Sequence, residues 1–204
     1  MTTLITDPNL ESTLQSERAA SGADRYDEVW EGIYMMNPMP NLEHQDIVNG
    51  FAAIFQDVIR WPGLGMVMPG ANVSDREVGW EKNYRVPDVA VCLRAGAAKN
   101  CGSHWLGGPD FVVEVVSPSD QTREKLDFYA SVGVRELLIV DREPWRLEML
   151  SLKQGKLAPT AACELRHPAP VTSAVLSLSF TLGPGEDRPA ILVQTIDGRK
   201  RWTI

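Results

Sequence analysis

The sequence predicts an α/β (α+β) domain in which helices flank a mixed β-sheet, with extra β elements at the C-terminal end. Three observations support this fold class. Residues 111–116 (FVVEVV) form a nearly continuous β-branched run, which is typical of a buried central strand. A helical pattern over 122–132 separates that run from a second apolar run at 136–141 (ELLIVD), so the two strands would pair in parallel through a right-handed crossover. The chain after residue 152 has a β-rich pattern.

The first part of the domain is predicted from turn and capping signals. Residues 1–23 are polar and small, and we expect a loosely attached N-terminal arm ahead of one domain over 24–204. The stretch 28–36 (EVWEGIYMM) predicts two extended pieces, or a tight hairpin, around Gly32. A helix should follow over about 41–59 with Asn41 as its N-cap. Its apolar face has members at helical spacing: Ile47, Phe51, Ile54, Phe55 and Val58.

The later elements follow from apolar runs and their breakers. Residues 66–78 predict one or two strands, and 86–93 (VPDVAVCL) a stronger one. The helix over 122–132 should end at Gly133. Residues 145–152 (WRLEMLSL) alternate and predict an edge strand, and Asp197-Gly198 is a strong signal for a two-residue hairpin turn.

Composition limits the class of protein. The chain has 204 residues, with 20 Lys and Arg against 27 Asp and Glu, and a net charge of −7. This charge argues against a protein that coats nucleic acid, but it is compatible with a nuclease because metal-binding carboxylates add negative charge. The N-terminus lacks the features of a signal peptide and no apolar run could span a bilayer, which predicts a cytoplasmic protein. Three cysteines without a CxxC motif predict free thiols.

Two carboxylates and one ammonium have positions that point to chemistry. Asp88 follows Pro87 where the strand 86–93 begins, Glu114 interrupts the most apolar strand, and Lys125 lies on the next helix. Two carboxylates on neighbouring strands can share a hard divalent cation such as Mg²⁺, and an ammonium nearby can orient water or offset charge in the transition state. Structural interpretations stay open for each: a turn aspartate after proline for Asp88, an ion pair for Glu114, and a solvated helix lysine for Lys125.

The segment PDVAV…PDFVVEVVSPSD…REKLDFYASVGVRELLIVD resembles the Uma2 family of bacterial proteins, of the DUF820 type. That family is similar to the restriction-endonuclease-like domains of the PD-(D/E)xK superfamily. The resemblance runs from about Arg25 to Leu152 and includes EVWEGIYMMNPMPNLEHQDIV, where the family shows a strand, a turn and a helix with a histidine. It divides the domain into a core over 25–152 and a C-terminal β extension over 153–204.

The resemblance implies a restriction-endonuclease-like fold and a metal-dependent endonuclease that hydrolyses DNA with Mg²⁺ or Mn²⁺. Asp88 would be the aspartate of the PD motif and Glu114 the acidic residue of the second half-motif, and both would bind the metal. The lysine expected two positions after Glu114 is Val116 in this chain. Lys125, in REKL, is the residue that would supply the charge from the following helix.

Two further residues match the family pattern. Glu28 falls on the glutamate of the first strand and would add a metal or water contact. His44 lies where the family has its helix histidine and would contact the metal shell or the scissile phosphate. A surface strand glutamate and a partly exposed first-turn histidine are the corresponding structural interpretations.

Two functions from different classes remain. The first is a Mg²⁺- or Mn²⁺-dependent nuclease with DNA as its substrate and no membrane partner. The second is a catalytically inactive nuclease-fold module for binding or regulation, which Val116 and the acidic charge favour. A homodimer is an open alternative, because many nucleases that cut both strands are symmetric dimers. Its candidate interface is formed by Leu147, Met149 and the C-terminal hairpin.

Overall fold

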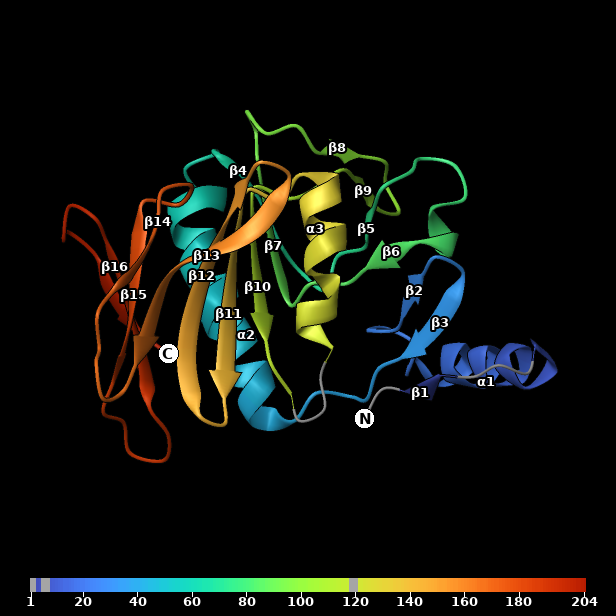
Figure 1. Ribbon diagram of the computed structural model, residues 1–204, viewed down its shortest axis with the longest axis horizontal. Helices are drawn as coiled ribbons and strands as arrows, with labels where there is room; N and C mark the ends of the chain where they lie inside the picture. Colours follow the sequence, from blue (N-terminus) through green and yellow to red (C-terminus); the bar gives the residue numbers. More distant parts are fainter. Residues whose placement is uncertain (1–2, 5–7, 118–120) are drawn as a thin grey trace.

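The structure, a computed structural model, describes residues 3–4, 8–117 and 121–204, and within them the chain forms three α-helices and three β-sheets (Figure 1). The helices are α1 (Pro8–Ser21), α2 (Leu42–Phe55) and α3 (Leu126–Val132). None of the helices in this part of the chain is long and apolar enough to cross a membrane. The predicted mixed α+β fold class is confirmed.

A six-stranded mixed sheet occupies the centre of the molecule. Its strands are β4 (Gly65–Pro69), β7 (Val89–Leu93), β10 (Phe111–Val115), β11 (Glu136–Arg142), β12 (Trp145–Lys153) and β13 (Lys156–Glu164). They lie in the order β13-β12-β11-β10-β7-β4. β10 pairs in parallel with β11 and antiparallel with β7, and all its residues are buried. The predictions of a central strand and of a parallel pair joined through a helix are therefore correct.

The strand predicted as an edge is an interior strand. β12 pairs with β11 on one side and with β13 on the other, so β13 is the edge. The chain reverses between β12 and β13 at Gln154 and Gly155, whose φ angles are 51° and 78°. An alternating pattern shows that one face of a strand is polar, but it does not show whether a second strand pairs along its side. It therefore could not distinguish an edge strand from an interior one. The polar Glu148 of β12 is satisfied by ion pairs with Arg123 and Arg146.

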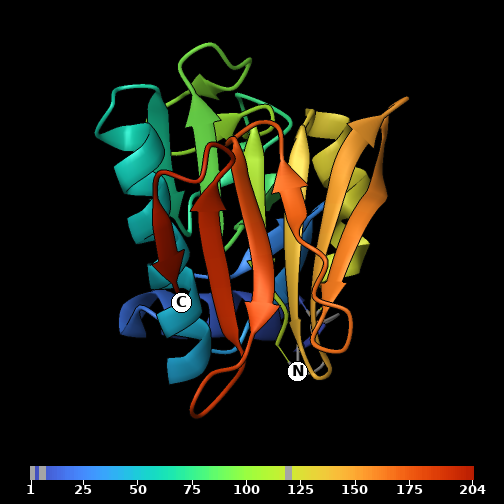
Figure 2. The same ribbon diagram turned by 90° about the vertical axis from the view of Figure 1, so that its left-hand side faces the viewer.

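Each face of the central sheet carries its own apolar core. On one face, Phe111, Val113 and Val115 pack with α2 and with the C-terminal sheet, which faces the viewer in Figure 2. On the other face, Val112 and Leu137 pack against α3. The C-terminal sheet has the strand order β14 (Val171–Ser173), β15 (Leu178–Gly183), β16 (Ala190–Thr195) and β17 (Arg201–Thr203).

The C-terminal hairpin signal is correct, because β16 pairs antiparallel with β17 across a turn that contains Gly198 at φ 69°. The candidate dimer interface is only partly available. Leu147 and Met149 are 0% and 1% exposed inside the core and cannot form an interface. The C-terminal sheet covers the face of β12 on which they lie.

A third sheet of short strands packs beside α3 (Figure 1). Its strands are β1 (Thr3–Leu4), β2 (Glu28–Trp30), β3 (Ile33–Met36), β5 (Val73–Ser74), β6 (Tyr84–Arg85), β8 (Lys99–Asn100) and β9 (Trp105–Leu106). The order is β1-β3-β2-β6-β5-β9-β8, and β2 with β3 forms the predicted hairpin. The Arg85 guanidinium lies 4.5 Å from the ring centre of Trp30 and 4.2 Å from that of Phe128, so it joins this sheet to α3.

The N-terminal segment is a helix held by an ion pair, whereas its composition predicted a loosely attached arm. Arg18 of α1 forms two bonds to the carboxylate of Asp27, at 2.5 and 2.6 Å, and also donates to the carbonyl of Asn37. Asp27 is 1% exposed. Polar composition missed this attachment because one buried charge pair makes it, and not a stripe of apolar residues.

The two helices near the site have the predicted ends. Asn41 caps α2, with its side chain accepting from the backbone N–H of His44 at 2.9 Å, and a π-helical turn over Gln56–Arg60 extends the helix to the expected length. A 3₁₀ turn over Thr122–Lys125 leads into α3, which ends at Gly133 with φ 91°. The three cysteines are free thiols, as predicted.

Candidate active site

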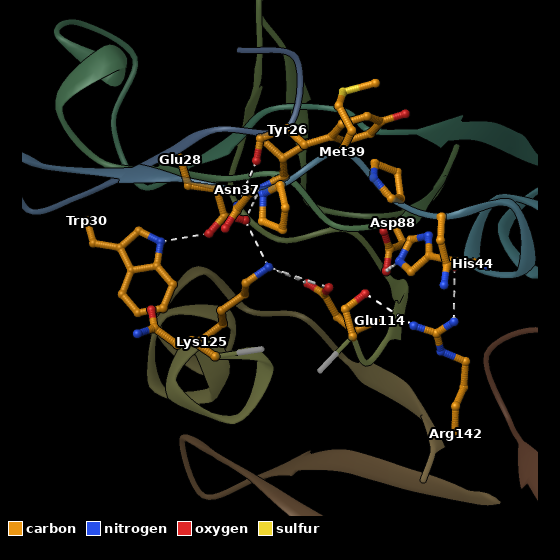
Figure 3. Close-up of a pocket in the computed structure, with 16 residues that line it drawn as sticks. Tyr26, Glu28, Trp30, Asn37, Met39, His44, Asp88, Glu114, Lys125 and Arg142 are labelled. Carbon is orange, nitrogen blue, oxygen red and sulfur yellow. Dashed lines mark hydrogen bonds and ion pairs between the residues drawn. The ribbon is translucent and has the colours of Figure 1, made fainter. Parts of the chain in front are cut away.

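A pocket of about 280 Å³ lies where β2, the start of α2 and the end of β10 meet (Figure 3). Its lining includes all five side chains that the sequence singled out: Glu28, His44, Asp88, Glu114 and Lys125. They come from β2, α2, the segment before β7, β10 and the turn before α3. The fold therefore brings residues from five separate parts of the chain to one cavity.

Strand pairing sets Asp88 beside the end of β10. The last pair in the register of the two strands is Val113 with Val89, so Glu114 and Asp88 are the next residues along each strand. The Asp88 carboxylate reaches across and accepts from the backbone N–H of Val115 through Oδ2, at 2.7 Å. Its other oxygen, Oδ1, has no hydrogen-bond partner among the described residues and is available to a ligand. Asp88 thus extends the hydrogen bonding between the two strands through Oδ2, while Oδ1 is left for a ligand.

Glu114 is a buried carboxylate with two kinds of partner. Oε1 accepts a short hydrogen bond from the hydroxyl of Tyr129 and lies 3.3 Å from the Lys125 ammonium, while Oε2 lies 3.5 Å from it. Burial first, and then the charges of Glu114 and Glu28, raise the pKa of Tyr129 well above its usual value. Tyr129 consequently stays protonated and acts as a hydrogen-bond donor.

Lys125 lies between two carboxylates. Its Nζ is 2.9 Å from Glu28 Oε1 and 3.3 Å from Glu114 Oε1 (Figure 3). Glu28 is held in turn by the backbone N–H of Val86 at 2.8 Å and by the indole N–H of Trp30 at 2.7 Å. Both Lys125 and Glu28 are buried, so Lys125 is not a solvated helix lysine and Glu28 is not a surface strand glutamate.

His44 is also buried, and not partly exposed as its structural interpretation required. Its Nε2 lies 3.2 Å from Asp88 Oδ2, on the same oxygen that accepts from Val115. Its Nδ1 is buried without a hydrogen-bond partner in the described part of the chain. His44 and the Val115 N–H together fix the orientation of the Asp88 carboxylate.

Sequence reasoning missed three polar groups of the site, of which Trp30 and Arg142 line the pocket and Tyr129 lies behind Glu114. Tyr129 was assigned to an apolar helix face, although it follows Lys125 by four residues and so shares its side of the helix. Trp30 holds Glu28. Arg142 of β11 donates to the Val116 carbonyl at 3.0 Å and to the Glu43 carboxylate at 2.8 Å. No local pattern marks Arg142, since its partners lie far from it in the sequence.

The donor set at the pocket suits a hard divalent cation. Among the described residues, no group of three or more His, Cys, Asp or Glu side chains is arranged to hold a metal ion. Mg²⁺ does not require such a group, because it is commonly bound through one or two carboxylates with water and phosphate oxygens as the other ligands. Asp88 and Glu114 are the two carboxylates that the sequence indicated for such a site, and both line the pocket.

Comparisons with known proteins point to one family. A family model named Uma2, with the description "Putative restriction endonuclease", matches residues 11–183. A solved structure described as a "putative nuclease belonging to DUF820", from Anabaena variabilis ATCC 29413, is similar with a TM-score of 0.57 and 18% sequence identity. The similarity covers 74% of this chain and 83% of that one, and at this identity it shows the fold. No curated protein matches the chain.

Proposed function

The chain belongs to the Uma2 family, and from that membership we propose that it is a metal-dependent endonuclease that hydrolyses phosphodiester bonds of DNA. One observation carries the proposal: Asp88, Glu114 and Lys125 line the same pocket, with the Lys125 ammonium 3.3 Å from Glu114. Two carboxylates and a cation in one cavity are the groups that metal-assisted phosphoryl chemistry uses. The family description and the DUF820 fold support the class of nuclease.

In this proposal, Asp88 and Glu114 hold Mg²⁺ or Mn²⁺. When bound, a divalent cation lowers the pKa of a coordinated water and offsets charge on the phosphoryl group. Asp88 would contribute its Oδ1 atom, because Oδ2 is engaged with Val115 and His44. The carboxylate is held before any ligand arrives, which reduces the cost of ordering the site.

The remaining residues act on the water and the phosphate. Lys125 supplies a positive charge beside Glu114, where it can orient the attacking water or stabilise charge that develops on the phosphoryl oxygens. Glu28 positions Lys125 through their 2.9 Å ion pair. His44 positions Asp88 through the 3.2 Å contact of its Nε2 with Asp88 Oδ2, and its ring, which lines the pocket, is a second-rank candidate for contact with the metal shell or the phosphate.

The alternative function is a nuclease-fold module without catalysis. Val116 stands where the pattern of the wider PD-(D/E)xK superfamily has its lysine, and it packs against the core beside α3. In that alternative the Lys125 pairs with Glu28 and Glu114 are structural only, and no metal binds between Asp88 and Glu114.

Cleavage of supercoiled plasmid and of single-stranded DNA tests the proposal. The wild type is compared with Asp88→Asn in Mg²⁺, in Mn²⁺ and with chelator, and Asp197→Asn serves as a matched control. Asn keeps an oxygen that can accept from Val115, so the variant should fold. Asp197 lies in the hairpin turn between β16 and β17, and Asn before Gly suits such a turn.

We expect metal-dependent cutting by the wild type and by Asp197→Asn, and none by Asp88→Asn. Cutting that survives in Asp88→Asn would remove Asp88 from the site. No cutting by folded wild type on either substrate would favour the module without catalysis.

A further inference from the structure

The charged groups of the pocket are recessed below its rim. The side chains of Glu28, Glu114, Lys125 and Asp88 are only 1%, 4%, 9% and 14% exposed. A phosphodiester must therefore enter the cavity to meet them, because they do not project from the surface. The cavity of about 280 Å³ is at the small end of ligand pockets, which limits what can enter to about one nucleotide unit.

The pocket has a second, apolar side that the proposed hydrolysis does not use. Tyr26, Pro38, Met39 and Pro40 contribute to its lining, and Tyr26 and Met39 lie on the side opposite Lys125 in Figure 3. Met39 lies between the two prolines and is 63% exposed, so its side chain is accessible to a ligand. Unpaired bases stack on aromatic side chains, and a base turned out of a duplex is held between aromatic and apolar side chains.

This rim is held in place before any ligand binds. The buried Asp27 accepts from the backbone N–H of Asn37 at 2.8 Å, and Arg18 donates to the Asn37 carbonyl at 2.8 Å. Pro38 and Pro40 restrict the backbone that follows. The apolar side is therefore a preformed surface at a fixed position relative to the carboxylates.

The charge around the pocket does not suit the backbone of a long duplex. Lys125 is paired with Glu28 and Glu114, and Arg142 with Glu43. The chain as a whole carries a net charge of −7. Proteins that grip duplex DNA offer several Lys and Arg side chains to its phosphates. Here both cations that line the pocket, Lys125 and Arg142, are paired with carboxylates, and the nearby Arg25 lies over the Tyr26 ring, 5.6 Å from its centre.

We propose that the pocket takes a single unpaired nucleotide, with its base against Tyr26 and Met39 and its phosphate toward Asp88, Glu114 and Lys125. The inference rests on the proposed nuclease function and names its substrate class: a single strand, or a nucleotide that has left the stack of a duplex. A nucleotide within an intact duplex would first have to be unpaired and turned out of the stack, at a cost in free energy.

The test uses three DNA substrates that share one labelled strand: the single strand, its perfect duplex, and a duplex with one unpaired nucleotide in the centre. Cleavage by wild type is measured with Mg²⁺ and with Mn²⁺. Binding is measured separately, by fluorescence anisotropy with the wild type in Ca²⁺, a hard cation that also takes oxygen ligands, so that recognition is read with both proposed metal ligands in place. Met39→Ala and Tyr26→Leu are then compared with the wild type in both measurements.

Trp61→Ala is the matched control for loss of an exposed apolar side chain. Trp61 is 73% exposed and follows the turn that ends at Arg60. It is separated from the pocket by the length of α2 and that turn, about 28 Å at 1.5 Å per residue.

We expect the single strand and the duplex with an unpaired nucleotide to be cut and bound about 10-fold or more better than the perfect duplex. Met39→Ala and Tyr26→Leu should each weaken binding of the single strand by about 5-fold, as loss of a stacking surface does, and Trp61→Ala should not. Comparing the single strand with the duplex that has one unpaired nucleotide shows whether the pocket prefers a free strand or a nucleotide turned out of a duplex.

Equal cutting and binding of the perfect duplex would overturn this inference while leaving the nuclease function intact. Unchanged binding in both rim variants, or no binding of any substrate, would overturn it as well. If folded wild type cuts none of the three substrates, the proposed function fails, and the anisotropy comparison still decides whether the pocket prefers an unpaired nucleotide.

Discussion

The ammonium of Lys125 lies 3.3 Å from the carboxylate of Glu114, although the two residues are 11 positions apart and belong to different elements. The turn that leads into α3 carries Lys125 back over the end of β10. The position two residues after Glu114 is occupied by Val116, which is partly buried and packs against the core beside α3. The fold thus sets a cation beside this carboxylate from a helix and not from the strand.

Replacing Lys125 by Met should lower both stability and activity. The change removes the ammonium that compensates the buried carboxylates of Glu28 and Glu114. Breaking a buried ion pair in this way costs about 3–5 kcal/mol of unfolding free energy, which urea denaturation would measure. Lys99→Met is the control, because that lysine is 60% exposed and its surface pair contributes at most about 1 kcal/mol. A Lys125→Met protein with wild-type stability and cleavage would mean that this cation is dispensable.

Adding Mg²⁺ should raise the melting temperature of the wild type, and chelator should reverse the rise. A ligand that binds only the folded state stabilises it in proportion to the logarithm of its concentration above Kd. Asp88→Asn should lose the effect because one of the two proposed ligands is gone, whereas Asp197→Asn should keep it. Thermal scans over a Mg²⁺ series make the measurement without any nucleic acid. Equal shifts in Asp88→Asn and wild type would place the metal elsewhere.

The elements that were predicted correctly are marked by patterns of neighbouring residues in the sequence. The β-branched run of β10 and the cap of α2 at Asn41 each act within a few residues. The status of β12 could not be predicted because it depends on whether β13 returns to pair with it. The attachment of α1 was missed because it depends on the single pair between Arg18 and Asp27.

The candidate site was predicted unevenly for a similar reason. Glu114 is unusual in its local context because it interrupts an apolar strand, whereas an aspartate after proline is common and the role of Asp88 was assigned by the family resemblance. Arg142 and Trp30 are ordinary in theirs, and they reach the pocket only because β11 and β2 are placed beside it by the fold. Their part in the site depends on strand pairing between distant segments, which the residues around them in the sequence do not indicate.

Replacing Glu114 by Leu should lower the melting temperature. A lone carboxylate in an apolar strand would be costly, and its removal would then stabilise the protein. Glu114 is not alone, however, because it accepts from Tyr129, which is 0% exposed. In Glu114→Leu the buried Tyr129 hydroxyl loses the carboxylate that accepts its hydrogen bond. This should lower the free energy of unfolding by about 1–3 kcal/mol.

The double variant Glu114→Leu with Tyr129→Phe isolates this effect. Replacing both partners by apolar groups of similar shape is close to neutral, so we expect most of the lost stability to return. The pair between Lys125 and Glu28 remains in both variants. A melting temperature that rises in Glu114→Leu alone would show that the carboxylate is poorly compensated in the apo protein.

Only one of the three thiols should react quickly in the folded protein. Cys163 is 0% exposed, and burial raises the pKa of the Cys92 thiol to about 12, so Cys92 carries almost no thiolate at pH 8. Cys101 is half-buried and accessible. A thiol reagent at pH 8 should therefore label one site rapidly, and Cys101→Ser should abolish that fast phase while denaturant restores the other two. Fast labelling that survives in Cys101→Ser would contradict the packing around Cys92 or Cys163.

Replacing Arg18 by Ala should weaken the pocket rim from a distance. Asp27 would lose a bidentate cation while keeping hydrogen bonds from Tyr34 and from the Asn37 N–H. Because Arg18 is 22% exposed, we expect the free energy of unfolding to fall by about 2 kcal/mol, less than for a fully buried pair.

The same variant should also affect binding of nucleic acid. The Asn37 carbonyl loses the hydrogen bond from Arg18, so affinity for a single strand should fall more than the cleavage rate at saturation. Arg18→Lys should restore part of both losses, since one ammonium replaces the charge but not the two-point geometry. Arg166→Ala, at an exposed position, is the control, and equal effects in the two alanine variants would show that Arg18 has no special link to the rim.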